Sequence, residues 1–154
     1  MAKFLSKIAL LLVVITVVFF GNRMLQGHLG QQAVKSLPFE IYNYEEGLQE
    51  AQRANKLILA DYSAIWCPVC RKLDEQIFST EQVSQKIADS FVYIRLEYDS
   101  VEGKAFAKKF DLQGFPRIIA LQPDGNAITE LPLVFDPVEY SNNLQKVLSS
   151  LSQH

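Results

Sequence analysis

The longest apolar stretch of the sequence lies close to its N-terminus. Residues 8–20 read IALLLVVITVVFF, in which Thr16 is the only polar residue, and Lys3 and Lys7 precede them. Basic residues followed by an apolar run are typical of a signal sequence or a signal-anchor. The run has 13 residues, whereas a helix that crosses a bilayer needs about 20. Flanking residues lengthen it if Lys7 and Arg23 extend their charged ends toward the lipid headgroups.

The residues after this run distinguish an anchor from a cleaved signal peptide. The sequence Phe19-Phe20-Gly21-Asn22-Arg23 lacks the two small residues, spaced as in Ala-x-Ala, that precede a cleavage site. We therefore expect residues 1–25 to remain as a signal-anchor, with a cleaved signal peptide as the alternative. A buried core helix is disfavoured because the run is apolar on every face. Residues 26–38 are polar and Gly-punctuated and are interpreted as a linker.

The rest of the chain alternates between strand and helix patterns. Asn43 can cap a helix, with Glu46 as its capping-box partner, and Pro123-Asp124-Gly125-Asn126 is a hairpin turn. Helices are expected from residue 43, from residue 67, over 80–89, over 101–110 and from residue 136, and strands over 56–62, 91–98, 117–121 and 127–131. Strands that alternate with helices and end in a hairpin predict an α/β fold over residues 39–154, with a mixed central sheet and helices on both faces.

The charge distribution argues against a nucleic-acid partner. The whole chain has a formal charge of −2, and the part after Arg23 carries 12 basic and 17 acidic residues, a formal charge of −5. The basic pairs Arg71–Lys72 and Lys108–Lys109 are isolated and are interpreted as solvated surface. Nucleic-acid-binding domains carry a basic face instead, so we expect no nucleic acid among the partners.

The two cysteines of the chain, Cys67 and Cys70, stand three positions apart, after a predicted strand and at the start of a predicted helix. Thiolates are the nucleophiles of disulfide exchange. A helix N-terminus favours a thiolate through its unpaired N–H groups and its positive dipole end. We therefore expect Cys67 to be exposed, to have a lowered pKa and to act as the nucleophile. Cys70, one turn further and more inward, would resolve the mixed disulfide, and Pro68 fits the first turn of the helix.

Two simpler interpretations compete with redox chemistry. A cysteine is often a small buried hydrophobe, but two of them around Pro68-Val69 and directly after Trp66 argue against coincidence. A structural zinc site needs four ligands, and the two histidines are His28, in the linker, and His154, at the C-terminus. Redox chemistry is thus the preferred interpretation. It needs no cofactor and no metal, because the cysteines themselves carry the two electrons.

The segment over residues 57–70, LILADYSAIWCPVC, resembles the active-site segment of thioredoxins, in which a strand, an aspartate, a tryptophan and a Cys-x-x-C motif follow in this order. Asp61 stands six residues before the first cysteine, as the buried aspartate of that family does. Phe115-Pro116, before a predicted strand, is similar to the family's cis-proline loop, and Arg95 stands where thioredoxins often carry a lysine. The resemblance extends over about residues 39–151 and implies a thioredoxin fold, preceded here by the N-terminal apolar helix.

The resemblance also implies roles for single residues. Asp61 would accept the proton of Cys70, because burial favours a protonated carboxyl group; the alternative is a carboxylate at the end of a strand that is solvated or caps a turn. Pro116, in a cis peptide, would shape a substrate-binding groove. Further candidate substrate-binding residues, which could instead belong to the core, are Trp66, Pro68 and Phe115.

The dipeptide between the cysteines bears on the direction of electron flow. Thioredoxins usually carry Gly-Pro there, whereas this chain has Pro68-Val69. Proline after the nucleophile is similar to the periplasmic disulfide oxidases, but these have a histidine, which helps to stabilise the thiolate, in place of Val69. We therefore expect a reductase or interchange protein that exchanges dithiol and disulfide with protein substrates. A disulfide oxidase or isomerase is the alternative, and in either case a redox partner must reset the cysteines.

Two hypotheses come from other functional classes. A non-catalytic thioredoxin-like module that docks a membrane partner would not need Cys67 and Cys70, and the intact motif argues against it. A copper-handling protein would use both thiolates, but no histidine or methionine belongs to the predicted domain near them; Met24 and Met1 lie outside it.

The lysines before the apolar run favour a cytoplasmic N-terminus. We therefore expect a single-pass protein of a bacterial inner membrane, with its domain facing the periplasm or the exterior. A soluble periplasmic protein is the alternative if the signal is cleaved.

Overall fold

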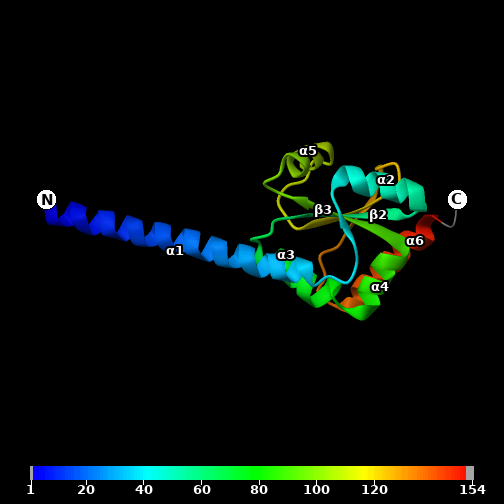
Figure 1. Cartoon of the computed structure of the whole chain (residues 1–154), viewed down its shortest axis with the longest axis horizontal. Coiled ribbons are helices and arrows are strands. Elements are labelled where there is room, and N and C mark those ends of the chain that lie inside the picture. Colours follow the sequence, from blue (N-terminus) through cyan, green and yellow to red (C-terminus); the bar gives the residue numbers. More distant parts are fainter. Residues whose placement is uncertain (1, 152–154) are drawn as a thin grey trace.

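The apolar run belongs to one long helix, α1 (Ala2–Lys35), which projects away from the rest of the molecule (Figure 1). The structure is a computed structural model that describes residues 2–151. Met1 and residues 152–154, including His154, lie outside the described residues. Apolar side chains over residues 8–20 are exposed, with Val17, Val18 and Phe19 at 61–66%. By length and composition, this helix can cross a membrane.

The C-terminal part of α1 differs from the expected linker. Residues 26–35 are helical, and contact with the domain accounts for this. Ala33 is 4% exposed, and a Cβ atom on Gly30 would lie only 1.9 Å from the carbonyl oxygen of Ile65. A glycine inside a helix costs about 1 kcal/mol relative to alanine, and here the close approach of the two backbones requires it. The helix ends at Lys35, shortly before Pro38, which is a common position for proline.

Five strands form one mixed sheet in the order β1-β3-β2-β4-β5. The parallel strands are β1 (Ile41–Tyr42), β2 (Leu57–Ser63) and β3 (Phe91–Glu97). The hairpin of β4 (Arg117–Leu121) and β5 (Ala127–Leu131) completes the sheet, with β4 antiparallel to β2. The mixed sheet and the closing hairpin are confirmed. The prediction missed β1, because two residues are too short to show an alternating pattern.

Helices cover both faces of this sheet, as expected (Figure 1). On one side lie α2 (Tyr44–Ala54) and α5 (Val101–Lys109). On the other lie α3 (Pro68–Leu73), which continues into the π-helical turn η1 (Asp74–Phe78), then α4 (Glu81–Ser90) and α6 (Pro137–Leu151). The predicted cap of α2 is confirmed, since Asn43 accepts a hydrogen bond from the Glu46 N–H at 2.9 Å.

The central strand β2 is buried along its whole length and divides the core into two. Ile58, Ala60 and Tyr62 pack with the α2 and α5 side. Leu57 and Leu59 pack with the opposite side, which α3, α4 and α6 cover. Because side chains alternate along a strand, Asp61 shares the face of Leu57 and Leu59. The strand therefore directs this carboxylate toward the helix that carries the cysteines.

Candidate active site

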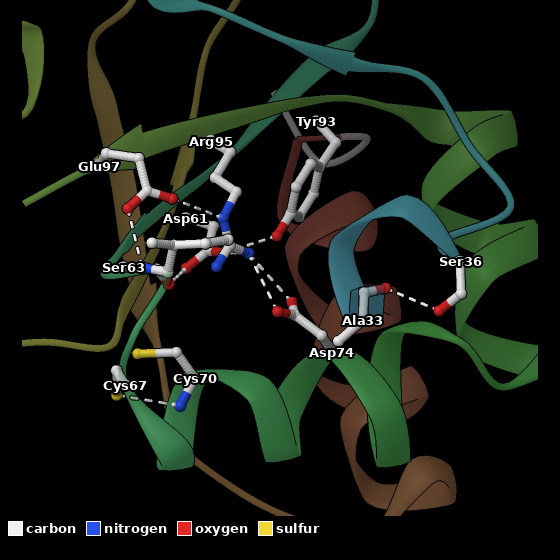
Figure 2. Close-up of polar contacts among 11 residues, drawn as sticks. Ala33, Ser36, Asp61, Ser63, Cys67, Cys70, Asp74, Tyr93, Arg95 and Glu97 are labelled. Carbon is white, nitrogen blue, oxygen red and sulfur yellow. Dashed lines mark hydrogen bonds and ion pairs between the residues drawn. The ribbon is translucent and has the colours of Figure 1, made fainter. Parts of the chain in front are cut away.

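The cysteine pair lies at the N-terminus of α3, directly after the loop that follows β2. Cys67 is the N-cap residue, with extended backbone geometry, and Pro68 occupies the first turn, as predicted. The Cys67 sulfur accepts a hydrogen bond from the backbone N–H of Cys70 at 3.1 Å (Figure 2). A sulfur atom thus takes the place of the side-chain oxygen that usually accepts a hydrogen bond from a free N–H group at a helix start.

The two thiols differ strongly in acidity. A hydrogen bond with the Cys70 thiol, together with the backbone N–H groups of Val69 and Cys70, lowers the pKa of Cys67 to about 6, although burial opposes this. The same side-chain hydrogen bond and burial raise the pKa of Cys70 well above its ordinary value. At neutral pH the pair therefore consists of a Cys67 thiolate and a Cys70 thiol.

The exposure of Cys67 differs from the prediction. Cys67 is only 6% exposed, and Cys70, expected to point inward, is 1% exposed. Both pack in a small cluster with Ala64, against which Trp66 and Phe115 lie. The prediction of exposure considered only the helix terminus, whereas the neighbouring aromatic side chains cover most of the residue.

An aromatic group borders the cysteines. The rings of Trp66 and Phe115 meet edge to face with centroids 5.4 Å apart, and Phe115 also contacts Tyr98 at 4.7 Å. The Phe115–Pro116 peptide is cis, as predicted. From these two residues a cleft of about 630 Å³ extends along the paired strands; its remaining lining residues are Arg117, Ile118, Glu130, Leu131, Pro132 and Leu133.

Asp61 lies behind Cys70 in a buried polar network. It is 1% exposed, so the alternative of a solvated carboxylate is excluded. The carboxylate accepts hydrogen bonds from the Tyr93 hydroxyl at 2.6 Å, from Arg95 Nη1 at 2.9 Å and from the Ser63 hydroxyl (Figure 2). Its charge adds to the hydrogen bond with Cys67 and to burial in raising the pKa of Cys70.

A second buried carboxylate, which the sequence analysis missed, faces the same guanidinium. Arg95 Nη1 also donates to Asp74, at 3.1 Å (Figure 2). Burial raises the pKa of Asp74 to about 7, against the attraction of Arg95, and the negative charge of Asp61 raises it further. The signal was present in the sequence, because Asp74 stands four residues after Cys70 and thus lies on the same side of the helical segment.

The network extends to the active-site loop. Arg95 Nε donates to Glu97 at 3.1 Å, and the other carboxylate oxygen of Glu97 accepts the backbone N–H of Ile65 at 2.8 Å (Figure 2). The loop residue before Trp66 is therefore tied through β3 to the same arginine that holds Asp61. Among residues 2–151, no group of three or more histidine, cysteine, aspartate and glutamate side chains is arranged to hold a metal ion.

The helix α1 reaches this site as well. Arg23 was expected to extend toward lipid headgroups, but the structure places its guanidinium 4.1 Å from the centroid of the Trp66 ring. Arg23 Nη2 forms an ion pair with Asp99 at 2.9 Å, and the Trp66 indole N–H donates to the same carboxylate oxygen at 3.1 Å. This contact depends on the docking of α1 on the domain, which the sequence pattern alone did not indicate.

Comparisons with known proteins agree with this geometry. A model of the thioredoxin-like family matches residues 40–123. The thiol:disulfide interchange protein DsbD of Yersinia pestis (strain Pestoides F) is 27% identical over 124 residues, which cover 77% of this chain and 21% of that protein. The chain thus spans about a fifth of the length of the curated relatives it matches.

Solved structures share the architecture. A thioredoxin from Thermus thermophilus superposes with a TM-score of 0.65 at 23% identity, covering 71% of this chain and 87% of that chain. The oxidised C-terminal domain of DsbD from Neisseria meningitidis superposes with a TM-score of 0.54 at 18% identity, covering 70% of this chain and 98% of that chain. The thioredoxin fold that the sequence predicted is therefore confirmed.

Proposed function

This chain belongs to the thioredoxin-like family of thiol–disulfide oxidoreductases, and we propose that it acts as a reductase or interchange protein on protein substrates. The observation that carries this proposal is the unequal acidity of the two thiols. The pKa of Cys67 is lowered to about 6, by the hydrogen bond with Cys70 first of all, and that of Cys70 is raised. Cys67 is thus a thiolate that can attack a disulfide, and Cys70 remains a thiol until the second step of the exchange.

In the proposed cycle, the Cys67 thiolate attacks one sulfur of a substrate disulfide and releases the other as a thiolate. Cys70 then loses its proton and attacks the Cys67 sulfur. This second step releases the reduced substrate and leaves a Cys67–Cys70 disulfide, so that two electrons have passed to the substrate. A separate redox partner restores the dithiol. Asp61, buried behind Cys70, is proposed to accept the Cys70 proton.

The candidate substrate-binding residues fit an extended polypeptide next to the sulfur atoms. Phe115 packs on the cysteine cluster and, with Pro116, also lines the cleft of about 630 Å³. Trp66 and Pro68 flank Cys67 in the sequence and line a smaller cavity against α1. The Trp66 ring contacts Phe115, and we propose that a substrate chain passes over this aromatic pair beside Cys67.

The direction of electron flow follows from what stabilises the thiolate. A more stable thiolate favours the reduced form of the pair and makes a stronger oxidant. The lowered pKa of Cys67, about 6, is much closer to that of thioredoxin, about 7, than to the value of about 3.5 for DsbA, a strong oxidant. Together with the absence of a histidine at Val69, this supports a reductase or interchange protein.

The reduction potential of the Cys67–Cys70 couple, measured by equilibration with glutathione, tests this direction. A value between about −270 and −200 mV, the range of thioredoxin and glutaredoxins, is expected. A value between about −180 and −120 mV would favour the isomerase or oxidase alternative. The wild-type chain should reduce a disulfide-bonded test protein such as insulin, and the double variant Cys67→Ser/Cys70→Ser should not. A non-catalytic binding module would keep its function in this variant, because it needs neither thiol.

We also propose that α1 anchors the chain in a bacterial inner membrane, with the domain on the periplasmic or outer face. The exposed apolar side chains of α1 and the lysines before them support this orientation. Redox partners and substrates would then meet the domain at that face. The alternative is a soluble periplasmic enzyme that remains after cleavage near the end of the apolar run.

A further inference from the structure

A small cavity of about 220 Å³ lies between α1 and the active-site loop. Two of its lining residues, Trp66 and Pro68, flank the nucleophile Cys67. The others all come from α1: Phe19, Asn22, Arg23 and Gln26. The long helix is therefore not only an extension of the chain. It forms one wall of a space whose other wall consists of the two residues that flank the reacting cysteine.

The position of this wall is fixed by two contacts. Near the cavity, Arg23 stacks on Trp66 at 4.1 Å and pairs with Asp99 at 2.9 Å. Further along the helix, Gly30 lies so close to the Ile65 carbonyl oxygen that a Cβ atom would be 1.9 Å from it. The residues of α1 that face the domain recur at the spacing of one helical face: Phe19, Arg23, Gln26, Gly30 and Ala33. These contacts hold α1 against the domain, so the cavity exists before any ligand binds.

One of the lining residues, Gln26, carries a polar atom without a partner. Gln26 Oε1 is buried, and no hydrogen bond reaches it from the described residues. A buried acceptor without a donor costs free energy, and buried polar groups are normally satisfied. Once the Gln26 side chain turns toward the cavity, a backbone N–H group of an extended polypeptide would supply the missing donor. Phe19, Trp66 and Pro68 offer apolar surface for a side chain of the same segment.

We propose that this cavity binds the segment next to the reactive cysteine of a membrane-embedded partner protein, with an apolar side chain against Phe19 and Trp66 and a backbone N–H donated to Gln26. Phe19 lies at the end of the apolar run and Arg23 directly after it, so the cavity lies where α1 would leave the bilayer. The segment that enters it must lie at the membrane surface and must carry a cysteine that reaches Cys67. This proposal rests on the proposed function.

The exchange at this subsite follows the same balanced chemistry. The Cys67 thiolate bonds to the cysteine sulfur of the segment, and the disulfide partner of that cysteine leaves as a thiolate. Cys70 then displaces the segment, which departs with a free thiol, and the enzyme retains the Cys67–Cys70 disulfide. The cavity would hold the segment through both steps, because Trp66 and Pro68, which line it, flank Cys67.

The experiment compares two probes on the full chain, reduced and reconstituted in phospholipid nanodiscs. One probe is a ten-residue peptide with a single cysteine, disulfide-linked to glutathione and followed by leucine; the other is glutathione disulfide. Phe19→Ala removes apolar surface and Gln26→Met removes the acceptor at equal side-chain length. We expect each variant to lower the ratio of the peptide rate to the glutathione disulfide rate by about threefold to tenfold.

A matched control makes the same chemical change outside the cavity. Gln31 is exposed on α1, and Gln31→Met should leave the ratio unchanged. The proposal is overturned if Phe19→Ala and Gln26→Met keep the wild-type ratio, or if the wild-type chain reduces glutathione disulfide but not the peptide. If the wild-type chain reduces neither probe, the proposed function itself is wrong.

Discussion

At the scale of single residues, Cys67 and Cys70 share one proton between two sulfur atoms. The hydrogen bond that lowers the pKa of Cys67 is also the main reason that the pKa of Cys70 is raised. Backbone N–H groups at the helix start add to the stabilisation of Cys67 alone. Burial and the charge of Asp61 further raise the pKa of Cys70. Of these causes only the backbone N–H groups belong to the helix start, and a mutation of Cys70 can separate them from the side-chain hydrogen bond.

Removal of the Cys70 thiol should reveal how much of the effect comes from the side chain. In the wild-type protein, iodoacetamide should modify Cys67 with a midpoint near pH 6, the value to which its pKa is lowered by Cys70 first of all. In Cys70→Ala the midpoint should move toward the ordinary value of about 8.5. Mass spectrometry after labelling at a series of pH values measures both. Faster modification of Cys70 than of Cys67 would mean that the roles are reversed.

Asp74 is a second residue whose state changes near neutral pH. Burial raises its pKa to about 7, so between about pH 4 and 7 the folded protein binds a proton that the unfolded chain has released. By linkage, the stability that this proton contributes is fully present below the unfolded pKa and is lost as the pH rises through 7. The slope of this loss is at most about 1.4 kcal/mol per pH unit.

Asp74→Asn should remove this pH dependence. Between pH 5 and pH 8, the free energy of unfolding of the wild-type protein should fall relative to that of the variant by about 2 kcal/mol. Urea unfolding of the reduced protein at both pH values measures the difference. Asp89→Asn, at an exposed position, is the matched control and should follow the wild type. Parallel profiles for Asp74→Asn and the wild type would show that Asp74 does not titrate in this range.

At the scale of secondary-structure elements, the contact between α1 and the active-site loop is the least expected feature. It depends on one position where two backbones approach each other closely. A Cβ atom at Gly30 would lie 1.9 Å from the Ile65 carbonyl oxygen, whereas a Cβ atom at Gly27, one turn earlier, would meet nothing within 4 Å. The two glycines therefore provide a matched pair of sites for the same substitution.

Gly30→Ala should destabilise the docked helix, and Gly27→Ala should stabilise it. Alanine gains about 1 kcal/mol over glycine inside a helix, and at Gly27 nothing opposes this gain. At Gly30 the collision forces the helix away from the loop, at an overpacking cost of about 1–3 kcal/mol that exceeds the gain. Hydrogen exchange of the α1 amides over residues 26–35 measures both effects. Equal protection in the two variants would argue against the close contact.

The elements that the sequence predicted correctly are those whose pattern is set locally. The hairpin turn, the cap at Asn43 and the short apolar run of β4 each leave a signal within a few residues. The Cys67–Cys70 motif likewise marks the site by its spacing alone. The helical part of α1 after residue 25 has a weak local signal, because it is polar and contains glycine, and it depends on packing against the domain. The role of Arg23 and the pairing of Asp74 with Arg95 also require segments that are distant in sequence to meet.

At the scale of the whole molecule, α1 is one continuous helix from the apolar run, the proposed membrane segment, to the active site. Its 34 residues extend over about 51 Å at 1.5 Å per residue. A bilayer core of about 30 Å takes up about 20 residues, so the remaining turns lie alongside the domain. A 13-residue linker, if extended, would have allowed the domain to move about 40 Å from the membrane. If α1 anchors the chain as proposed, the continuous helix instead holds Cys67 at a fixed height beside the bilayer surface.

This arrangement makes sense only if α1 remains part of the mature protein, and we predict that it does. The apolar side chains over residues 8–20 are exposed, and each fully buried large apolar side chain contributes about 1.5–3 kcal/mol when it leaves water. Thr16, the one polar residue among them, donates its hydroxyl to the Leu12 carbonyl at 2.8 Å, so it exposes no unsatisfied donor to lipid.

An epitope-tagged chain should therefore resist carbonate extraction and have the mass of the full-length protein. A soluble species shortened by about two dozen residues would contradict the anchor and would also remove Phe19 and Arg23 from the active site, while the cysteine chemistry itself would remain.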